Sequence, residues 1–159
     1  METMKTAAKS LLIIALMLGA CTPLANESEQ ARQTLSDFFD SLNQGSYIQA
    51  DQFFAGDYQL MTNNNPSIDP DDHQALWSNV CTINGFQCLT VRTATLKETN
   101  GDEYIFTVEF NNADGSLFVL GPCCGATETE MPPVSRFEYR VQKMPDGRFV
   151  VLDLPVYVP

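Results

Sequence analysis

The spacing of the hydrophobic residues changes once along the chain, after Cys88. Before that point apolar side chains recur at helical spacing, which places them on one face of a helix. The clearest such run contains Ala31, Leu35, Phe38, Phe39 and Leu42. After Cys88 apolar and polar residues alternate, as in a strand with one buried face, and the clearest run contains Tyr104, Phe106, Val108 and Phe110. Helices followed by a meander of hairpin strands predict an α+β fold, in which N-terminal helices pack on an antiparallel sheet.

Turn and cap residues set the bounds of the expected elements. We expect a helix from Glu27 to Gly45 and a second one that Ser46 caps and Gly56-Asp57 ends. A third helix is expected from Asp69, because Asp-Pro-Asp-Asp supplies a cap, a proline at the first position and acids in the first turn. Strands are expected over residues 89–96, 104–110, 116–120, 136–141 and 149–154, separated by turns and by a long loop over 121–133.

The N-terminal segment has the order of a secretory signal. Lys5 and Lys9 precede an apolar run from Leu11 to Leu18, which is too short to span a bilayer because spanning needs about 20 residues. The run ends in Leu18-Gly19-Ala20-Cys21, which resembles the lipobox of bacterial lipoproteins. The resemblance implies a diacylglyceryl thioether on Cys21, cleavage before it and acylation of the new amino group.

This reading divides the chain into a signal peptide over 1–20, a short linker over 21–29 and a single α+β domain over 30–159. The domain is then expected outside the cytoplasm, anchored to a bacterial membrane through lipid on Cys21, because two or three acyl chains attach a protein stably. The alternative is an ordinary cleaved signal in which Cys21 is incidental.

The charge balance restricts the classes of partner. The chain carries 20 acidic and 9 basic residues, for a net charge of −11. A negative surface argues against binding to nucleic acid or docking on anionic lipid, since like charges repel. Solubility is a sufficient explanation for the excess of acids.

The two expected N-terminal helices suggest a family. The sequence FFDSLNQG over residues 38–45 leads into YIQADQFF over residues 47–54. This pattern resembles the opening of nuclear transport factor 2-like domains. The resemblance implies a cone-like α+β fold with a bent sheet and an apolar hollow between the helices and the sheet, and it carries over no catalytic residue. Trp77, Tyr58 and Asp57 are the candidate pocket residues.

Four further cysteines are Cys81, Cys88, Cys123 and Cys124. An even number in an exported chain favours disulfides. In one scheme Cys81 bonds to Cys88, and Cys123 and Cys124 either bond to each other or stay reduced. In the other scheme two cross-links join the 81–88 loop to Cys123 and Cys124. A vicinal pair could also act as a redox switch, whereas a zinc site lacks the usual Cys-x-x-Cys spacing.

The other polar candidates have structural explanations. His73 is the only histidine, so a catalytic triad has no basis, and we expect its side chain to face solvent. Helix capping accounts for the acids at 69–72 better than calcium does. Arg136 and Arg140 alternate with Glu138 on one strand face, which is typical of solvated cross-strand pairs, and a small anion site is the alternative.

No complete catalytic set is present, and no metal or cofactor is implied. The leading hypothesis is therefore a lipid-anchored, non-enzymatic module that binds an apolar small molecule or an envelope protein. A competing hypothesis is a cofactor-free enzyme of the ketosteroid isomerase or dehydratase type, which needs a carboxylate in an apolar pocket; Asp57 and Asp153 are its candidates. A third is a structural envelope lipoprotein.

Overall fold

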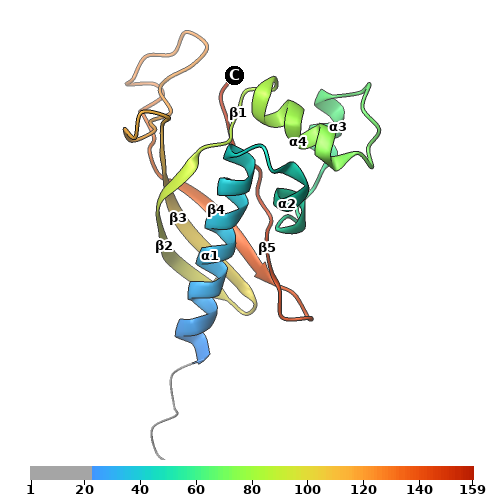
Figure 1. Ribbon diagram of the computed structural model, residues 1–159. Coiled ribbons are helices and arrows are strands. Elements are labelled where there is room, and N and C mark those ends of the chain that lie inside the picture. The colour runs from blue at the N-terminus through green and yellow to red at the C-terminus, as the bar shows by residue number, and fades with distance from the viewer. Residues whose placement is uncertain (1–22) are drawn as a thin grey trace, which may run out of the picture.

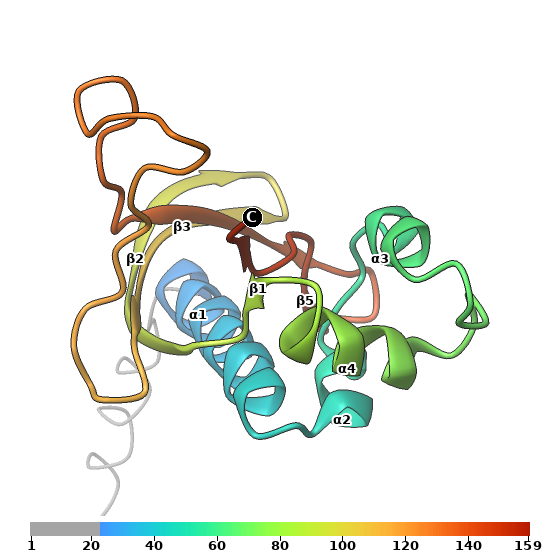
Figure 2. The same cartoon turned by 90° about the horizontal axis from the view of Figure 1, so that it is seen from above.

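The computed structural model describes residues 23–159 and contains four helices and two antiparallel sheets. Helix α1 (Pro23–Asn43) lies in the curve of the larger sheet, and the three shorter helices gather beside its C-terminal half (Figure 1, Figure 2). The predicted α+β fold, with N-terminal helices packed on an antiparallel sheet, is confirmed. The first apolar run is the reason, because all five of its side chains are at most 1% exposed.

The larger sheet is a meander. Its strands are β2 (Thr90–Asn100), β3 (Glu103–Asn111), β4 (Phe137–Lys143) and β5 (Phe149–Val151), paired in that order. Along β3 every second side chain is buried, as the alternation predicts. The register of β2 against β3 shifts after Val91 and again after Leu96. Such irregularities bend a strand and increase its twist, which fits the curvature around α1 in Figure 2.

The short helices are α2 (Tyr47–Gln52), α3 (Gln59–Asn64) and α4 (His73–Thr82). The predicted start of the third helix at Asp69 is wrong, because α4 begins only at His73. Its cap is Asp72, whose carboxylate accepts a hydrogen bond from the backbone of Ala75 at 3.0 Å. Asp69 instead closes a turn ahead of the helix, accepting from the backbone N–H of Asp71 at 3.0 Å. Both Asp69 and Asp72 could serve as the N-cap, and Asp72 is the one that caps α4.

One expected strand does not form, and another is shorter than expected. Residues 116–120 form no strand and pair through isolated bridges, Asn111 to Leu117 and Leu120 to Val134. The last predicted strand reduces to β5, which ends at Val151. The segment after α2 runs beside β5 in parallel, with Ala55 donating to the Val151 carbonyl at 3.0 Å. A small second sheet pairs β1 (Phe86–Gln87) with β6 (Val156–Tyr157).

The predicted linker over 21–29 is helical from Pro23 onward. Glu27 explains this, because its carboxylate accepts from the Tyr104 hydroxyl at 2.8 Å and from Lys143 Nζ at 2.7 Å. These contacts fasten the early turns of α1 to β3 and β4. No helix within the described part of the chain is long and apolar enough to cross a bilayer.

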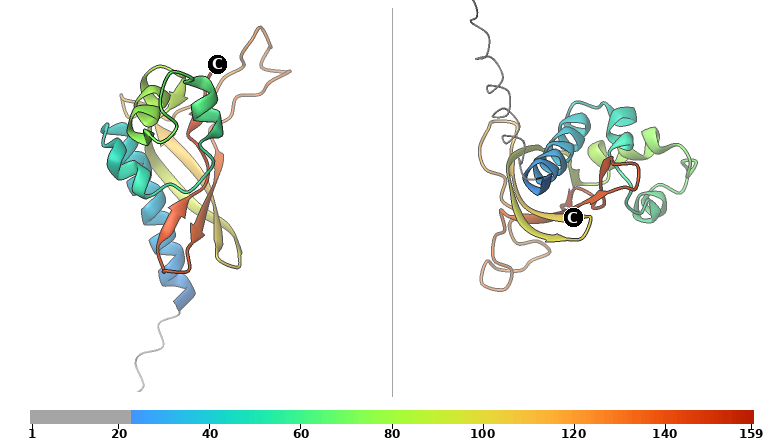
Figure 3. Two further views of the ribbon diagram at one scale, coloured as in Figure 1. Left: turned by 90° about the vertical axis from the view of Figure 1, so that its right-hand side faces the viewer. Right: turned by 90° about the horizontal axis from the view of Figure 1, so that it is seen from below.

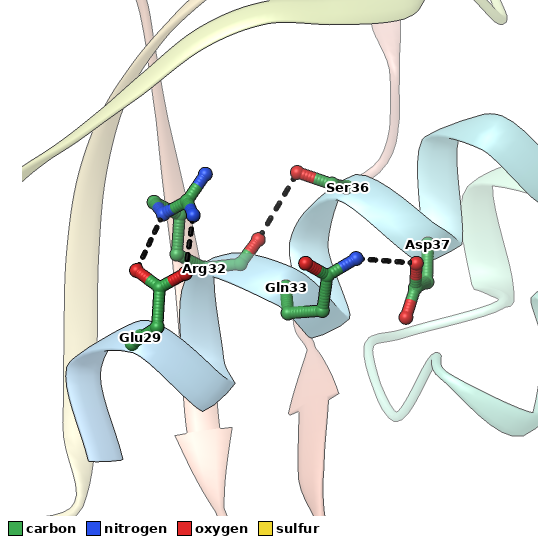
Figure 4. A network of polar contacts seen from close by, with 5 residues as sticks. All are labelled: Glu29, Arg32, Gln33, Ser36 and Asp37. Carbon is green, nitrogen blue, oxygen red and sulfur yellow. Dashed lines mark hydrogen bonds and ion pairs between the residues drawn. The ribbon is translucent and has the colours of Figure 1, made fainter. Parts of the chain in front are cut away.

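The other side of α1 is polar, as Figure 4 shows. The Arg32 guanidinium pairs with Glu29 one turn earlier, and Gln33 Nε2 donates to Asp37 at 2.8 Å. Ser36 donates back to the Arg32 carbonyl at 3.2 Å. Contacts of this spacing support a helix weakly, so burial of the apolar face is what fixes α1 in place.

Candidate functional site

Tyr58 and Trp77 meet on the helical side of the molecule. Trp77 lies on α4 and is fully buried, whereas Tyr58, just ahead of α3, is half-buried. Both rings pack on Phe54, with centroid distances of 5.1 Å for Tyr58 and 5.0 Å for Trp77. The third predicted pocket residue, Asp57, is exposed, and its carboxylate makes a local turn ahead of α3 by accepting from the Gln59 N–H at 2.8 Å. The structure therefore brings two of the three residues together.

The acid that faces Tyr58 is Asp51, on α2. The Tyr58 hydroxyl donates to Asp51 Oδ1, and His73 Nδ1 lies 3.0 Å from the same oxygen. The His73 ring stacks on the Tyr58 ring at 3.9 Å between centroids and 13° between planes. The side chain of His73 is 36% exposed, so it faces solvent in part as expected, but it also has two partners that the sequence did not indicate. We call Asp51, Tyr58 and His73 the α2–α4 cluster.

Burial sets the protonation state of the Tyr58 phenol. Burial, and then the hydrogen bond to Asp51, raise the pKa of Tyr58, so the phenol stays protonated and remains a donor. The Trp77 indole N–H lies near this phenol and partly opposes the rise in its pKa. Among the described residues the indole N–H makes no hydrogen bond of normal geometry. Asp51 fixes the orientation of the imidazole through Nδ1, which leaves Nε2 to exchange a hydrogen bond with a ligand.

Asp51 is the residue that sequence reasoning missed. It follows Ala50 on α2, outside the apolar face that defines that helix, and a single acid at such a position is usually solvated. The single histidine, His73, was the one feature of the sequence that could have suggested a polar site here. Its partner can be identified only from the packing of α2 against α4.

The two candidate arginines are each neutralised. Arg136 Nε lies 3.2 Å from Glu109 Oε1, and the Arg140 guanidinium binds Asp153 with its closest contact at 2.6 Å. Asp153 also accepts from the Arg140 backbone N–H at 2.7 Å. These are the solvated pairs that the alternation indicated. They also remove Asp153 as an acid held in an apolar pocket.

Two of the cysteines are joined. A disulfide links Cys81, on α4, to Cys88, just after β1, with 5.4 Å between their Cα atoms. Cys123 and Cys124 are thiols in the loop between β3 and β4. Across residues 23–159 no group of three or more His, Cys, Asp or Glu side chains is arranged to hold a metal ion. The proposed lipid attachment residue, Cys21, lies outside the described residues.

No protein-family model matches the chain, and a search of curated proteins finds no match.

Proposed function

We propose that this chain is a bacterial lipoprotein, held outside the cytoplasm by lipid on Cys21, whose folded domain binds a partner and performs no catalysis. The observation that carries the proposal is the sequence Leu18-Gly19-Ala20-Cys21, which ends a short apolar run directly ahead of α1. Acylation needs a cysteine at that position, and the joined Cys81–Cys88 pair suits an oxidising compartment.

The start of α1 supports an anchor close to the folded domain. In the sequence only Thr22 separates Cys21 from Pro23, the first residue of α1. Two residues of chain can span at most about 7 Å. Glu27 fastens the early turns of α1 through Tyr104 and Lys143. Lipid on Cys21 would therefore hold this end of the domain near the membrane. The loop over 121–134, at the opposite end in Figure 1 and Figure 3, would face away from it.

The arrangement of α1 within a curved sheet supports a nuclear transport factor 2-like domain. In the space where that resemblance implies a hollow, aromatic rings pack edge to face, with Phe39 4.7 Å from Phe110 and 5.0 Å from Tyr139. We therefore favour an envelope protein over an enclosed apolar molecule as the partner.

The half-exposed α2–α4 cluster is the place we assign to binding, because it offers oriented polar groups beside an aromatic stack. The isomerase-type alternative needs an acid in an apolar pocket. Asp57 is exposed in a turn and Asp153 is ion-paired, so we rank binding ahead of catalysis.

Metabolic labelling with a palmitate analogue tests the anchor. We expect label on the wild-type protein and none on Cys21→Ala. Cys123→Ala is the matched control, since it removes a different free thiol, and it should keep the label. An unlabelled wild type, or label that persists in Cys21→Ala, would contradict the proposal.

Native mass spectrometry of the protein released from membranes tests the binding role. We expect a second polypeptide on the wild type that is lost in His73→Gln and retained in Tyr157→Phe. His73→Gln removes the stacked imidazole, whereas Tyr157 lies apart from the α2–α4 cluster, on β6. The bare protein in every sample would count against a bound protein partner.

A further inference from the structure

The loop over 121–134 presents two adjacent thiols away from the body of the molecule. A pair of backbone hydrogen bonds between Leu120 and Val134, at 2.8 and 2.9 Å, closes its base. Beyond that base the loop projects from the sheet, as Figure 1 and Figure 3 show. Within it Cys124 is exposed and Cys123 is half-buried. Reagents in solution therefore have access to the pair.

Cys124 occupies a backbone position that cysteine does not favour. The Ala126 N–H donates to the Cys123 carbonyl at 3.0 Å, and the two residues between them have φ values of +60° at Cys124 and +88° at Gly125. Positive φ at both central positions defines a type I′ turn, where Gly, Asn and Asp are usual. Cys124 is the only non-glycine residue with positive φ in the described chain. A cysteine held in an unfavourable backbone conformation at the surface points to a function for its sulfur.

The sulfur atoms are placed for bonding to each other. Their Sγ atoms lie 2.8 Å apart, well inside van der Waals contact. Two thiolates sharing a tetrahedral metal ion at about 2.3 Å would be about 3.8 Å apart, so the spacing favours a disulfide over chelation.

We propose that Cys123 and Cys124 are a thiol–disulfide exchange site, which closes to a vicinal disulfide by reducing the disulfide of a second compound. This goes beyond the proposed function and does not depend on it. The exposed Cys124 thiolate attacks one sulfur of that disulfide, and the other sulfur leaves as a thiolate. Cys123 then loses its proton and attacks Cys124 Sγ, which expels the remaining sulfur. Two electrons and two protons pass to the second compound, whose disulfide becomes two thiols, and the reverse sequence reopens the pair.

The order of attack follows from the environment of each thiol. The neighbouring Cys124 thiol, and then burial, raise the pKa of Cys123, so it forms a thiolate less readily. Cys124 is also the more accessible of the two. Cys124 is therefore the attacking residue and Cys123 the resolving one.

The vicinal bond should open more easily than Cys81–Cys88. Adjacent Cα atoms are about 3.8 Å apart across a trans peptide, below the usual range of about 4.4–6.8 Å for a disulfide. The Cα atoms of Cys81 and Cys88 are 5.4 Å apart, within that range. Deviation from the usual geometry makes a disulfide easier to reduce.

Equilibration of the purified full chain with mixtures of reduced and oxidised glutathione tests the proposal. After acid quenching, alkylation and peptide mass mapping, we expect the 123–124 peptide to lose two hydrogens on oxidation and to gain two alkyl groups on reduction. The ratio of reduced to oxidised glutathione that reduces half of the pair should be at least about tenfold lower than the ratio that reduces half of Cys81–Cys88. Two thiols that stay open at every ratio, or glutathione adducts that persist on the wild type, would overturn the proposal.

Two variants keep the test decisive. Cys123→Ser should stop at a glutathione adduct on Cys124, because the resolving thiol is missing. Cys124→Asn should keep the turn, since Asn suits its first central position, and should form no disulfide at Cys123. An intact Cys81–Cys88 bond reports correct folding in both variants. Failure of Cys123→Ser to form any adduct would contradict attack by Cys124.

A second series replaces glutathione with an oxidised protein of the thioredoxin fold. Closure that is faster than with glutathione at equal concentration would identify a protein disulfide as the reactant. Closure that is faster with glutathione would identify a small one. Closure with neither would refute the exchange site.

Discussion

Gly56 shows how one missing side chain lets two segments meet. It follows the stretch that runs beside β5, and a Cβ atom placed there would lie 2.2 Å from the Leu152 carbonyl oxygen. We expect Gly56→Ala to lower the free energy of unfolding by about 2 kcal/mol or more, because a backbone atom would have to move. Gly121→Ala is the matched control: nothing lies within 4 Å of its Cβ position, so urea unfolding should change by less than about 0.5 kcal/mol. Equal stability of the two variants would contradict this packing.

The Tyr58 hydroxyl gives a second prediction at the residue scale. It donates to Asp51 from a half-buried position, and hydrogen bonds to charged groups contribute about 1.5–3 kcal/mol when buried. With partial exposure we expect Tyr58→Phe to lower the free energy of unfolding by about 1 kcal/mol, measured in urea. Tyr157→Phe, at a site half exposed to solvent, should change it by less than about 0.5 kcal/mol. No loss in Tyr58→Phe would argue against the α2–α4 cluster.

At this scale the sequence was informative about burial and uninformative about polar partners. Trp77 and the phenylalanines of α1 are core residues because their spacing leaves no other place for them. The contact of His73 with Asp51 joins residues 22 positions apart, across two helices. Neither residue has a neighbour in the sequence that indicates this contact, so only tertiary packing reveals it.

Among the elements, α1 depends on pH through Glu27. Hydrogen bonds from Lys143, and then from Tyr104, lower the pKa of Glu27 below its ordinary value. A carboxyl whose pKa is lower in the folded state stabilises the fold above its unfolded pKa, and this contribution is lost as the pH falls through the folded value. Between about pH 7 and about pH 3 the urea midpoint of the wild type should therefore fall more than that of Glu27→Gln.

The control for this comparison is Glu128→Gln, which removes an exposed carboxylate from the loop over 121–134. Its urea midpoint should follow the wild type at both values of pH. If Glu27→Gln kept the full pH dependence of the wild type, the tether between α1 and the sheet would not depend on this carboxylate.

The Cys81–Cys88 link constrains the connection from α4 to the sheets. Closing a loop between residues 7 positions apart contributes about 2.5 kcal/mol on the chain-entropy estimate. We expect the double variant Cys81→Ala, Cys88→Ala to lose about that much stability in urea. Under oxidising conditions a wild type as unstable as this variant would contradict a stabilising link.

The elements that sequence predicted best are the long periodic ones. α1 and β3 each repeat one spacing over many residues, so no alternative pattern competes. The start of α4 was misplaced because Asp69 and Asp72 both offer a cap. The strand expected over 116–120 is absent for a different reason. These residues meet the end of β3 and Val134 through isolated bridges, and the sequence does not reveal pairing partners.

For the whole molecule, the order of helices and strands was sufficient to predict the layers. It did not predict that α2, α3 and α4 gather at one end of α1, where the α2–α4 cluster forms (Figure 1). Asp57 lies outside the cluster for this reason: it follows Asp51 by less than two helical turns, yet its carboxylate accepts from the Gln59 N–H while Asp51 is a member of the cluster. Side-chain direction at a helix junction depends on turns that the sequence pattern leaves open.

The lipid anchor is the claim on which location, orientation and function all depend. The intact mass of protein extracted from the membrane fraction with detergent tests it most directly. We expect the mass of residues 21–159 increased by a diacylglyceryl group and an amide-linked acyl chain, and the cysteine at the new N-terminus as the modified residue. Recovery of the full 159-residue chain from the cytosol, with no added mass, would contradict the account.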